Sequence, residues 1–331
     1  MRSLKQFFNK KFYIPALVVL VILFGLALKS NLDVVKEIKP ASNVEEENTT
    51  DKTVSINKEP LSSNVSSPDI AFDKPVPNSA ITEPETKPTN TNQQKDSISA
   101  LSNSKAGWGL KTNNEHQQPE IPTSINSLLK KYKAYWIGNP EDKIVYLTFD
   151  EGYENGYTPK ILDILKSNDV KAAFFVTGHY VKTQPDLVKR MVDEGHIVGN
   201  HTDSHPSMPD ISDEQIKQEL QIVENEYQNI TDIKGMTYLR PPKGEYSERT
   251  LALTSEMGYS SIFWSIALVD WVPMPNGSDQ AYQGVMDKLH NGAVILLHAI
   301  SKDDTEALDK IIKDVKAQGY TFKTLDDLVK E

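Results

Sequence analysis

The spacing of apolar residues changes repeatedly along the second half of the chain, and these changes predict alternating strands and helices. Short, nearly continuous apolar runs are typical of strands buried on both faces of a parallel sheet. They occur at 143–149, 171–177, 197–200, 261–269 and 293–297, with shorter runs at 238–239 and 320–323. Segments with apolar residues every three or four positions predict helices at 158–167, 185–194, 212–227, 247–257, 281–289 and 305–317.

Residues at the ends of these segments support the helix predictions. Pro159 stands at an early helical position, where its missing N–H costs nothing. Ser212 and Gln215 have the spacing of a capping box at the start of a helix. Gly195 and Gly258 follow two of the helical segments and predict their ends.

The order of the elements predicts the fold class. About seven strand–helix units with short connections predict an α/β domain with a parallel sheet and right-handed crossovers. The pattern leaves open whether this sheet is an open, doubly wound one or a barrel. Both folds place their active sites at the carboxyl ends of the strands.

Composition divides the chain into three parts. Residues 1–30 combine a basic start with an almost entirely apolar run at 12–28, which predicts a signal anchor with the N-terminus in the cytoplasm. The alternative is a cleaved signal peptide and a secreted protein. Residues 31–118 are polar and predict a disordered extracytoplasmic linker. Residues 119–331 form the expected catalytic domain, with 107–110 and 125–137 covering its N-terminal side.

Charge and cysteine content exclude several classes of function. The formal net charge of −10 and the lack of a basic stripe argue against nucleic acid as a partner. The absence of cysteine excludes a disulfide-stapled domain and a thiolate metal site. The sequence carries no signal for an oligomeric state.

Two polar groups at predicted strand ends indicate the chemistry. The run at 143–149 ends at Asp150 and Glu151, and His201 and His205 stand four residues apart after the strand at 197–200. Taken singly, such an acid is more often a turn former, and such a histidine pair is more often a surface or core feature. Together they predict a metal-assisted hydrolase, with zinc or another late first-row metal such as cobalt. A two-carboxylate glycosidase is the alternative, but it gives the histidine pair no role.

Three further motifs follow apolar runs. They are Arg240-Pro241-Pro242-Lys243-Gly244, Asp270-Trp271 and Leu296-Leu297-His298. The ordered set of five motifs resembles the polysaccharide deacetylases with a NodB-homology domain, from about residue 143 to the C-terminus. The runs E-N-G-Y-T, F-V-T-G-H-Y and R-P-P-K-G-E-Y-S-E-R-T-L are similar to the delta-lactam-biosynthetic branch from spore-forming bacteria. This resemblance implies a distorted (β/α) barrel with about seven parallel strands.

The resemblance also implies roles for individual residues. Asp150 would be the general base, held by Arg240, and His298 the general acid, oriented by Asp270. His201 and His205 would bind the metal, which is zinc in the first instance, with cobalt or manganese as alternatives.

The third metal ligand of the family falls on Glu151, where most relatives carry aspartate. The backbone N–H of Lys243 would stabilise the oxyanion, and Trp271 would form a wall for a sugar ring, with core packing as its alternative role. His179 is a weaker candidate for the cleft. The other histidines, His196, His290 and His116, are expected to be structural or to lie on the surface or in the linker.

The branch resemblance implies a substrate and a biological setting. It predicts metal-dependent de-N-acetylation of N-acetylmuramic acid in peptidoglycan, which leads to muramic δ-lactam in the spore cortex. Lys243 or Lys182 would then face the lactyl carboxylate. The alternatives are a deacetylase of N-acetylglucosamine in peptidoglycan or chitin-like oligomers, and an inactive cell-wall-binding module.

Overall fold

Strands and helices alternate in the order that the periodicity predicts. The computed structural model describes residues 98–111 and 115–330. The longer strands of its main sheet are β3 (Ile144–Glu151), β4 (Ala173–Val176), β5 (Ile197–Asn200) and β10 (Ala293–His298). The shorter ones are β2 (Ala134–Tyr135), β6 (Tyr238–Leu239), β8 (Ser260–Ile262), β9 (Ile266–Ala267) and β11 (Thr321–Phe322).

The helices match the predicted segments closely. They are α3 (Thr123–Lys131), α4 (Thr158–Ser167), α5 (Gly178–Thr183), α6 (Pro185–Asp193), α7 (Asp213–Thr231), α8 (Glu248–Glu256), α9 (Gly277–Met286), α10 (Lys302–Ala317) and α11 (Leu325–Leu328). The predicted capping box at Ser212 and Gln215 is confirmed at the start of α7. Helices α9 and α10 begin a few residues before their predicted starts, and α3, α5 and α11 were not predicted as helices.

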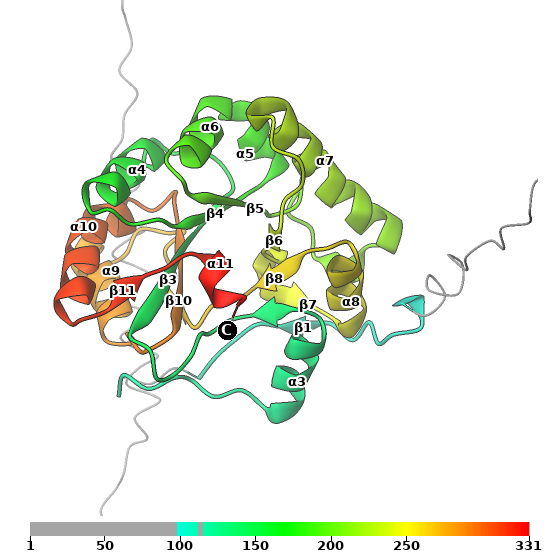
Figure 1. Cartoon of the computed structure of the whole chain (residues 1–331), viewed down its shortest axis with the longest axis horizontal. Helices are drawn as coiled ribbons and strands as arrows, with labels where there is room; N and C mark the ends of the chain where they lie inside the picture. The colour runs from blue at the N-terminus through cyan, green and yellow to red at the C-terminus, as the bar shows by residue number, and fades with distance from the viewer. Residues whose placement is uncertain (1–97, 112–114, 331) are drawn as a thin grey trace, which may run out of the picture. The chain divides into compact units, whose positions relative to one another are not determined.

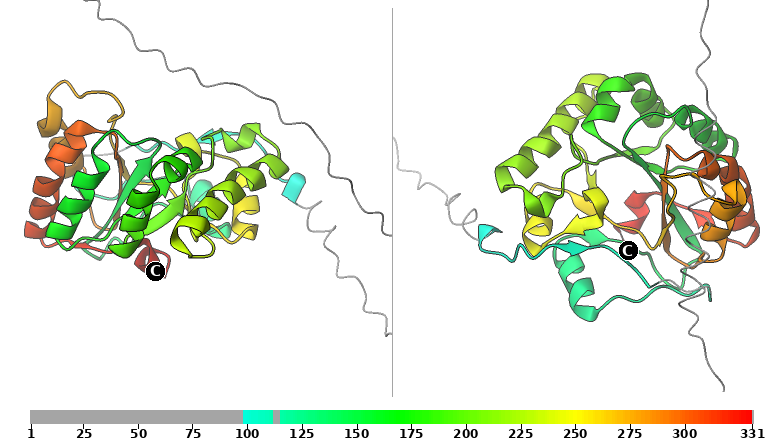
Figure 2. Two further views of the ribbon diagram at one scale, coloured as in Figure 1. Left: turned by 90° about the horizontal axis from the view of Figure 1, so that it is seen from above. Right: turned by 180° about the vertical axis from the view of Figure 1, so that it is seen from behind.

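The main sheet is parallel and curled, with helices around its outside (Figures 1 and 2). Its order is β2-β8-β6-β5-β4-β3-β10-β9, and β11 pairs with β3. Residues 260–267 connect two distant parts of the sheet and so curl it. Strand β8 pairs with β6, whereas β9, a few residues later, pairs with β10. The predicted barrel-like α/β fold is thus confirmed, with nine strands in the described sheet instead of about seven. The predicted strand at 261–269 is split into β8 and β9.

Alternation along β3 separates two apolar layers. Val145, Leu147 and Phe149 pack in the large core between the sheet and the helices. Tyr146 points into the barrel, where it packs with residues of β4, β8, β10 and α11. Successive side chains on a strand face opposite sides, so residue 150 continues the inner face and residue 151 the outer one. This register decides which acid reaches the inner face.

An N-terminal segment covers one side of the barrel. The strand β1 (Ala106–Gly107) pairs antiparallel with β7 (Glu245–Tyr246), and Trp108 stacks on Phe263 at a ring distance of 4.7 Å. Helix α3 contributes Leu129 to the same small core. The predicted cover at 107–110 and 125–137 is therefore present. Residues 98–111, which fall within the predicted linker, already belong to the folded part.

The predicted signal anchor at 1–30 and the linker up to residue 97 lie outside the described residues. Within the described ranges, no helix is both long and apolar enough to span a bilayer.

Candidate active site

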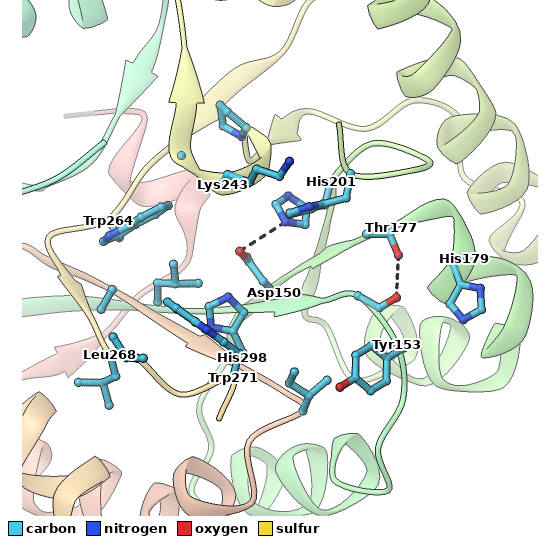
Figure 3. Close-up of a pocket in the computed structure, with 18 of the residues that line it drawn as sticks. Asp150, Tyr153, Thr177, His179, His201, Lys243, Trp264, Leu268, Trp271 and His298 are labelled. Carbon is cyan, nitrogen blue, oxygen red and sulfur yellow. Dashed lines mark hydrogen bonds and ion pairs between the residues drawn. The ribbon is translucent and has the colours of Figure 1, made fainter. Parts of the chain in front are cut away.

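The carboxyl ends of neighbouring strands bring the predicted motifs together. Asp150 on β3 is directly paired in register with His298 on β10. His201 follows the last residue of β5, and Arg240 follows the last residue of β6, which pairs with β5 at that level. Figure 3 shows Asp150, His201 and His298 converging on one cleft. The fold therefore places these side chains at one edge of the sheet without any long loop.

A buried ion pair fixes Asp150. Arg240, which is 0% exposed, donates from Nη1 to Asp150 Oδ1 at 2.7 Å and from Nη2 to Thr148 Oγ1 at 2.8 Å. Its Nε donates to the carbonyl of Ile262 at 3.2 Å, and its guanidinium lies 4.2 Å from the ring centre of Phe175. Each of the three guanidinium nitrogens thus donates a hydrogen bond, which fixes the orientation in which Arg240 holds the carboxylate.

This pair also sets the charge of Asp150. Burial opposes its ionisation, but the Arg240 guanidinium and the nearby His201 and His298 hold the pKa of its carboxyl below the usual value. Asp150 is therefore a carboxylate near neutral pH. Its second oxygen, Oδ2, remains turned towards His201, at 3.5 Å from Nε2.

The two histidines are neutral and close together. Burial lowers the pKa of His201, and burial with the neighbouring His201 lowers the pKa of His205 to about 4. Their ring centres are 4.8 Å apart. His201 Nδ1 lies 2.8 Å from the carbonyl oxygen of Arg240, which can only accept, so this nitrogen carries the proton. The lone pair of Nε2 consequently faces the Asp150 carboxylate.

Two facing acceptors fit a cation between them. The Nε2 lone pair and the Asp150 oxygen repel each other unless a proton donor or a positive ion lies between them. The neutral imidazoles of His201 and His205 therefore suit a divalent metal, with open positions for water or substrate. Three protein ligands are usual for catalytic zinc, but no cluster of three His, Cys, Asp or Glu side chains arranged for a metal occurs within 98–111 and 115–330.

The expected position of Glu151 has to be corrected. Strand β3 continues through this residue, so the chain does not turn at Asp150 and the two neighbouring side chains face opposite sides. Both Glu151 oxygens lie 3.4 Å from the Thr158 hydroxyl at the start of α4, in the layer between the sheet and the helices. Burial, with the nearby Glu154, raises the pKa of Glu151 well above its usual value. The structure thus places Glu151 on the outer face of the sheet, away from the histidines.

His298 and Asp270 form a second pair, in which Asp270 is buried and His298 is partly exposed to the cleft. Asp270 Oδ1 lies 2.7 Å from His298 Nδ1, and Asp270 Oδ2 accepts from the His298 backbone N–H at 2.8 Å. Burial alone would lower the pKa of His298, but the hydrogen bond to Asp270 and the charge of Asp150 raise it above the usual value. The pair thus holds a proton on Nδ1 and leaves Nε2 to exchange a proton with a bound molecule.

The loop at 240–244 is tightly constrained. Lys243 and Gly244 have φ values of 59° and 64°, so the chain turns sharply after the two prolines. A Cβ at position 244 would lie 2.8 Å from the Trp264 ring and 3.0 Å from Trp108, which leaves room for glycine only. Trp108 also donates from its indole to the Trp264 carbonyl at 2.9 Å. The Lys243 side chain lines the cleft; the oxyanion role of its N–H remains a prediction.

The cleft measures about 1270 Å³ and has an apolar wall. Trp271 is 56% exposed, and its ring meets that of His298 edge-on at 5.5 Å, so it lies at the cleft and not in the core. Tyr153, 51% exposed, lines the cleft too, and His179 is among the lining residues. Tyr153, Trp264 and Leu268 were not among the predicted site residues, although only Gly152 separates Tyr153 from Asp150 and Glu151.

Comparison with known proteins agrees with this site. The sequence profile described as polysaccharide deacetylase matches residues 137–262. The chain is 49% identical to the peptidoglycan-N-acetylmuramic acid deacetylase PdaA of Bacillus subtilis, over 70% of this chain and 89% of that protein. The chain belongs to the polysaccharide deacetylase family. Its fold matches the solved structure of PdaA, a family 4 carbohydrate esterase, with a TM-score of 0.67 over 70% of this chain and all of that one.

A more distant member has a different named substrate. The chain is 36% identical to a peptidoglycan-N-acetylglucosamine deacetylase of Bacillus cereus, over 61% of this chain and 74% of that protein. Membership makes the protein a hydrolase of the family 4 carbohydrate esterases. The predicted family and enzyme class are thereby confirmed.

The His298–Asp270 pair predicts a pH dependence. Asp270 raises the pKa of His298, whereas burial lowers it. Replacement of Asp270 by neutral asparagine removes the first effect, so the pKa of His298 should fall. If His298 acts as an acid, activity is lost as pH rises through its pKa, and Asp270→Asn therefore shifts the alkaline limb of the kcat/KM profile to lower pH by about one unit. The measurement is a pH profile of wild type and variant. A shift to higher pH contradicts this reading of the pair.

Proposed function

We propose that the protein deacetylates N-acetylmuramic acid residues of peptidoglycan, as its Bacillus subtilis relative is named to do. The observation that carries the proposal is the placement of Asp150 and His298 at the same level of adjacent strands, facing one cleft. One is held as a carboxylate and the other has a raised pKa. A base and an acid so arranged can serve the two proton transfers of amide hydrolysis.

The chemistry follows from these two residues. Asp150 takes a proton from the attacking water while a C–O bond forms at the acetyl carbonyl. His298 then gives its Nε2 proton to the sugar nitrogen as the C–N bond breaks, which releases acetate and a free amine. Arg240 keeps Asp150 ionised and aimed, and Trp271 lies against the imidazole of His298.

We include a divalent metal in the proposal. Held by His201 and His205, it would supply a Lewis acid for the acetyl carbonyl. Zinc suits two imidazoles, with cobalt or manganese as alternatives. His201 Nε2 and Asp150 Oδ2 are acceptors that face each other at 3.5 Å, and a nearby cation would remove their repulsion. This geometry supports the metal part of the proposal.

The muramic substrate is supported by identity and by charge. The branch motifs and the 49% identity to PdaA favour it over N-acetylglucosamine. A muramic residue without its peptide carries a lactyl carboxylate, and two lysines are candidates to meet it. Lys182 is paired with Asp203 at 3.0 Å, whereas Lys243 lines the cleft beside His205. Lys243 is therefore the better candidate.

The proposal has a cellular setting. Peptidoglycan lies outside the membrane, and the sequence at 1–30 supports export by an anchor or a cleaved signal. Formation of muramic δ-lactam in a spore cortex is the proposed use of the product. Digestion of the domain by protease added to intact cells tests the location.

The catalytic part predicts the loss of activity in Asp150→Asn. This variant keeps the shape of the side chain but removes the base, so acetate release from N-acetylated glycan should fall by about 10²- to 10⁴-fold. The assay uses purified protein, with circular dichroism and unfolding curves to show that the variant folds. Undiminished release by folded Asp150→Asn would rule out the assigned base.

The metal part predicts that Glu151 has no influence on metal binding. Glu151→Gln keeps the shape of the side chain on the outer face, and the zinc affinity of this variant in calorimetric titration should equal that of wild type. His201→Ala and His205→Ala should each weaken binding by about 10- to 100-fold or more. A comparable loss in Glu151→Gln would show that its carboxylate reaches the metal.

The substrate part predicts a selective effect at Lys243. Lys243→Met should lower kcat/KM by about tenfold for muramic residues with a free lactyl carboxylate, because it removes their charge partner. Lys243→Arg should keep most of that activity, and glucosamine residues should be unaffected by either change. Mass spectrometry of digested glycan, with and without its stem peptides, locates the product. Deacetylation of glucosamine alone overturns the muramic assignment and leaves the deacetylase assignment intact.

A further inference from the structure

Behind the His298–Asp270 pair lies another buried acid, Asp304. It belongs to the first turn of α10, where its backbone N–H donates to Ser301 Oγ at 3.1 Å. Its carboxyl group interacts with that of Asp270, and this interaction raises the pKa of Asp304 and lowers the pKa of Asp270. Asp304 and Asp270 are 2% and 3% exposed, so water does not solvate either carboxyl group.

The hydrogen bonds of the two acids are unequal. Asp270 accepts from both the Nδ1–H and the backbone N–H of His298. Neither carboxyl oxygen of Asp304 receives a hydrogen bond of normal geometry from the described residues. An ionised Asp304 would be a buried, unsolvated charge beside the negative charge of Asp270, which is strongly unfavourable. A single proton on Asp304 removes this charge and creates a donor for Asp270.

We propose that Asp304 is a neutral carboxylic acid whose O–H donates to Asp270, and that it is a positioning residue for His298. Three donors then hold the Asp270 carboxylate, two from His298 and one from Asp304. The hydrogen bond from Asp304 also reduces the negative charge that Asp270 presents to His298. Asp270 therefore orients the imidazole while raising the pKa of His298 less than a carboxylate without this bond would.

The charged surroundings support a neutral Asp304. Burial, the facing Asp270 carboxyl and the adjacent Asp303 raise the pKa of Asp304 to about 10, against the opposing effect of the Ser301 hydroxyl. Asp303 itself accepts from the backbone N–H of Met274 at 2.8 Å. The first turn of α10 thus holds the segment around Asp270 and Trp271 at two points.

The test compares two replacements of nearly equal shape in the full-length protein. Asp304→Asn keeps a neutral donor for Asp270, and Asp304→Leu removes it while still excluding water. The first measurement is an infrared difference spectrum of wild type against Asp304→Asn at neutral pH. We expect a carbonyl band of a protonated carboxyl group in wild type that the variant lacks.

The second measurement follows the pKa of His298 by NMR of histidine labelled with ¹⁵N, assigned with His298→Gln. Asp304→Asn should leave this pKa within about 0.3 unit, and Asp304→Leu should raise it by about half a unit or more, because Asp270 keeps its full charge. Turnover by Asp304→Leu should show a lower kcat with little change in KM.

Other outcomes overturn the proposal. An ionised Asp304 would give no carboxyl band, and both variants would then lower the pKa of His298. A band together with an unchanged pKa in Asp304→Leu would remove the positioning role. The acid role of His298 comes from the proposed function, but the infrared and NMR measurements do not use turnover. Failure of the Asp304 proposal is therefore distinguishable from failure of the proposed function.

Discussion

The active site depends on one buried ion pair. Arg240 lies entirely inside the barrel, and a guanidinium in that position is tolerable only when it is paired and fully hydrogen-bonded. Asp150, Thr148 and the Ile262 carbonyl supply the acceptors, and the Phe175 ring covers one face. Because these partners come from β3, β4 and the end of β8, the pair links strands around the barrel. The same bonds keep the base ionised and aimed at the cleft.

Much of the fold and of the site could be predicted because the signals are local. Apolar runs that end in polar residues gave the strands and the edge at which Asp150, His201, Arg240 and His298 meet. The helix at 158–167 was predicted to the residue, since Pro159 and the apolar spacing define it. The break between β8 and β9 was not predicted, because Phe263 and Trp264 continue the apolar pattern while the chain changes partners.

Two features of the site needed the three-dimensional register. Glu151 was expected to turn towards the histidines, but the strand continues and alternation sends it to Thr158. Asp304 looks like an ordinary acid in the first turn of a helix, where acids are favoured by the helix dipole. Its proximity to Asp270 comes from the packing of α10 against α9, the helix that follows the Asp270 segment, which no sequence spacing reveals. Contacts between acidic residues that are far apart in the sequence are thus a part of the site that sequence patterns miss.

The Trp108 contact bears on where this catalytic unit begins. Trp108 hydrogen-bonds to the Gly244 carbonyl and to that of Trp264, and its side chain flanks the glycine that turns the loop carrying Lys243. The sequence profile of the family starts only at residue 137. A chain cut at that boundary, or at residue 119, would keep every proposed catalytic residue and lose one wall of the loop beside them. In domain exchange between relatives, the segment around Trp108 therefore has to travel with the barrel.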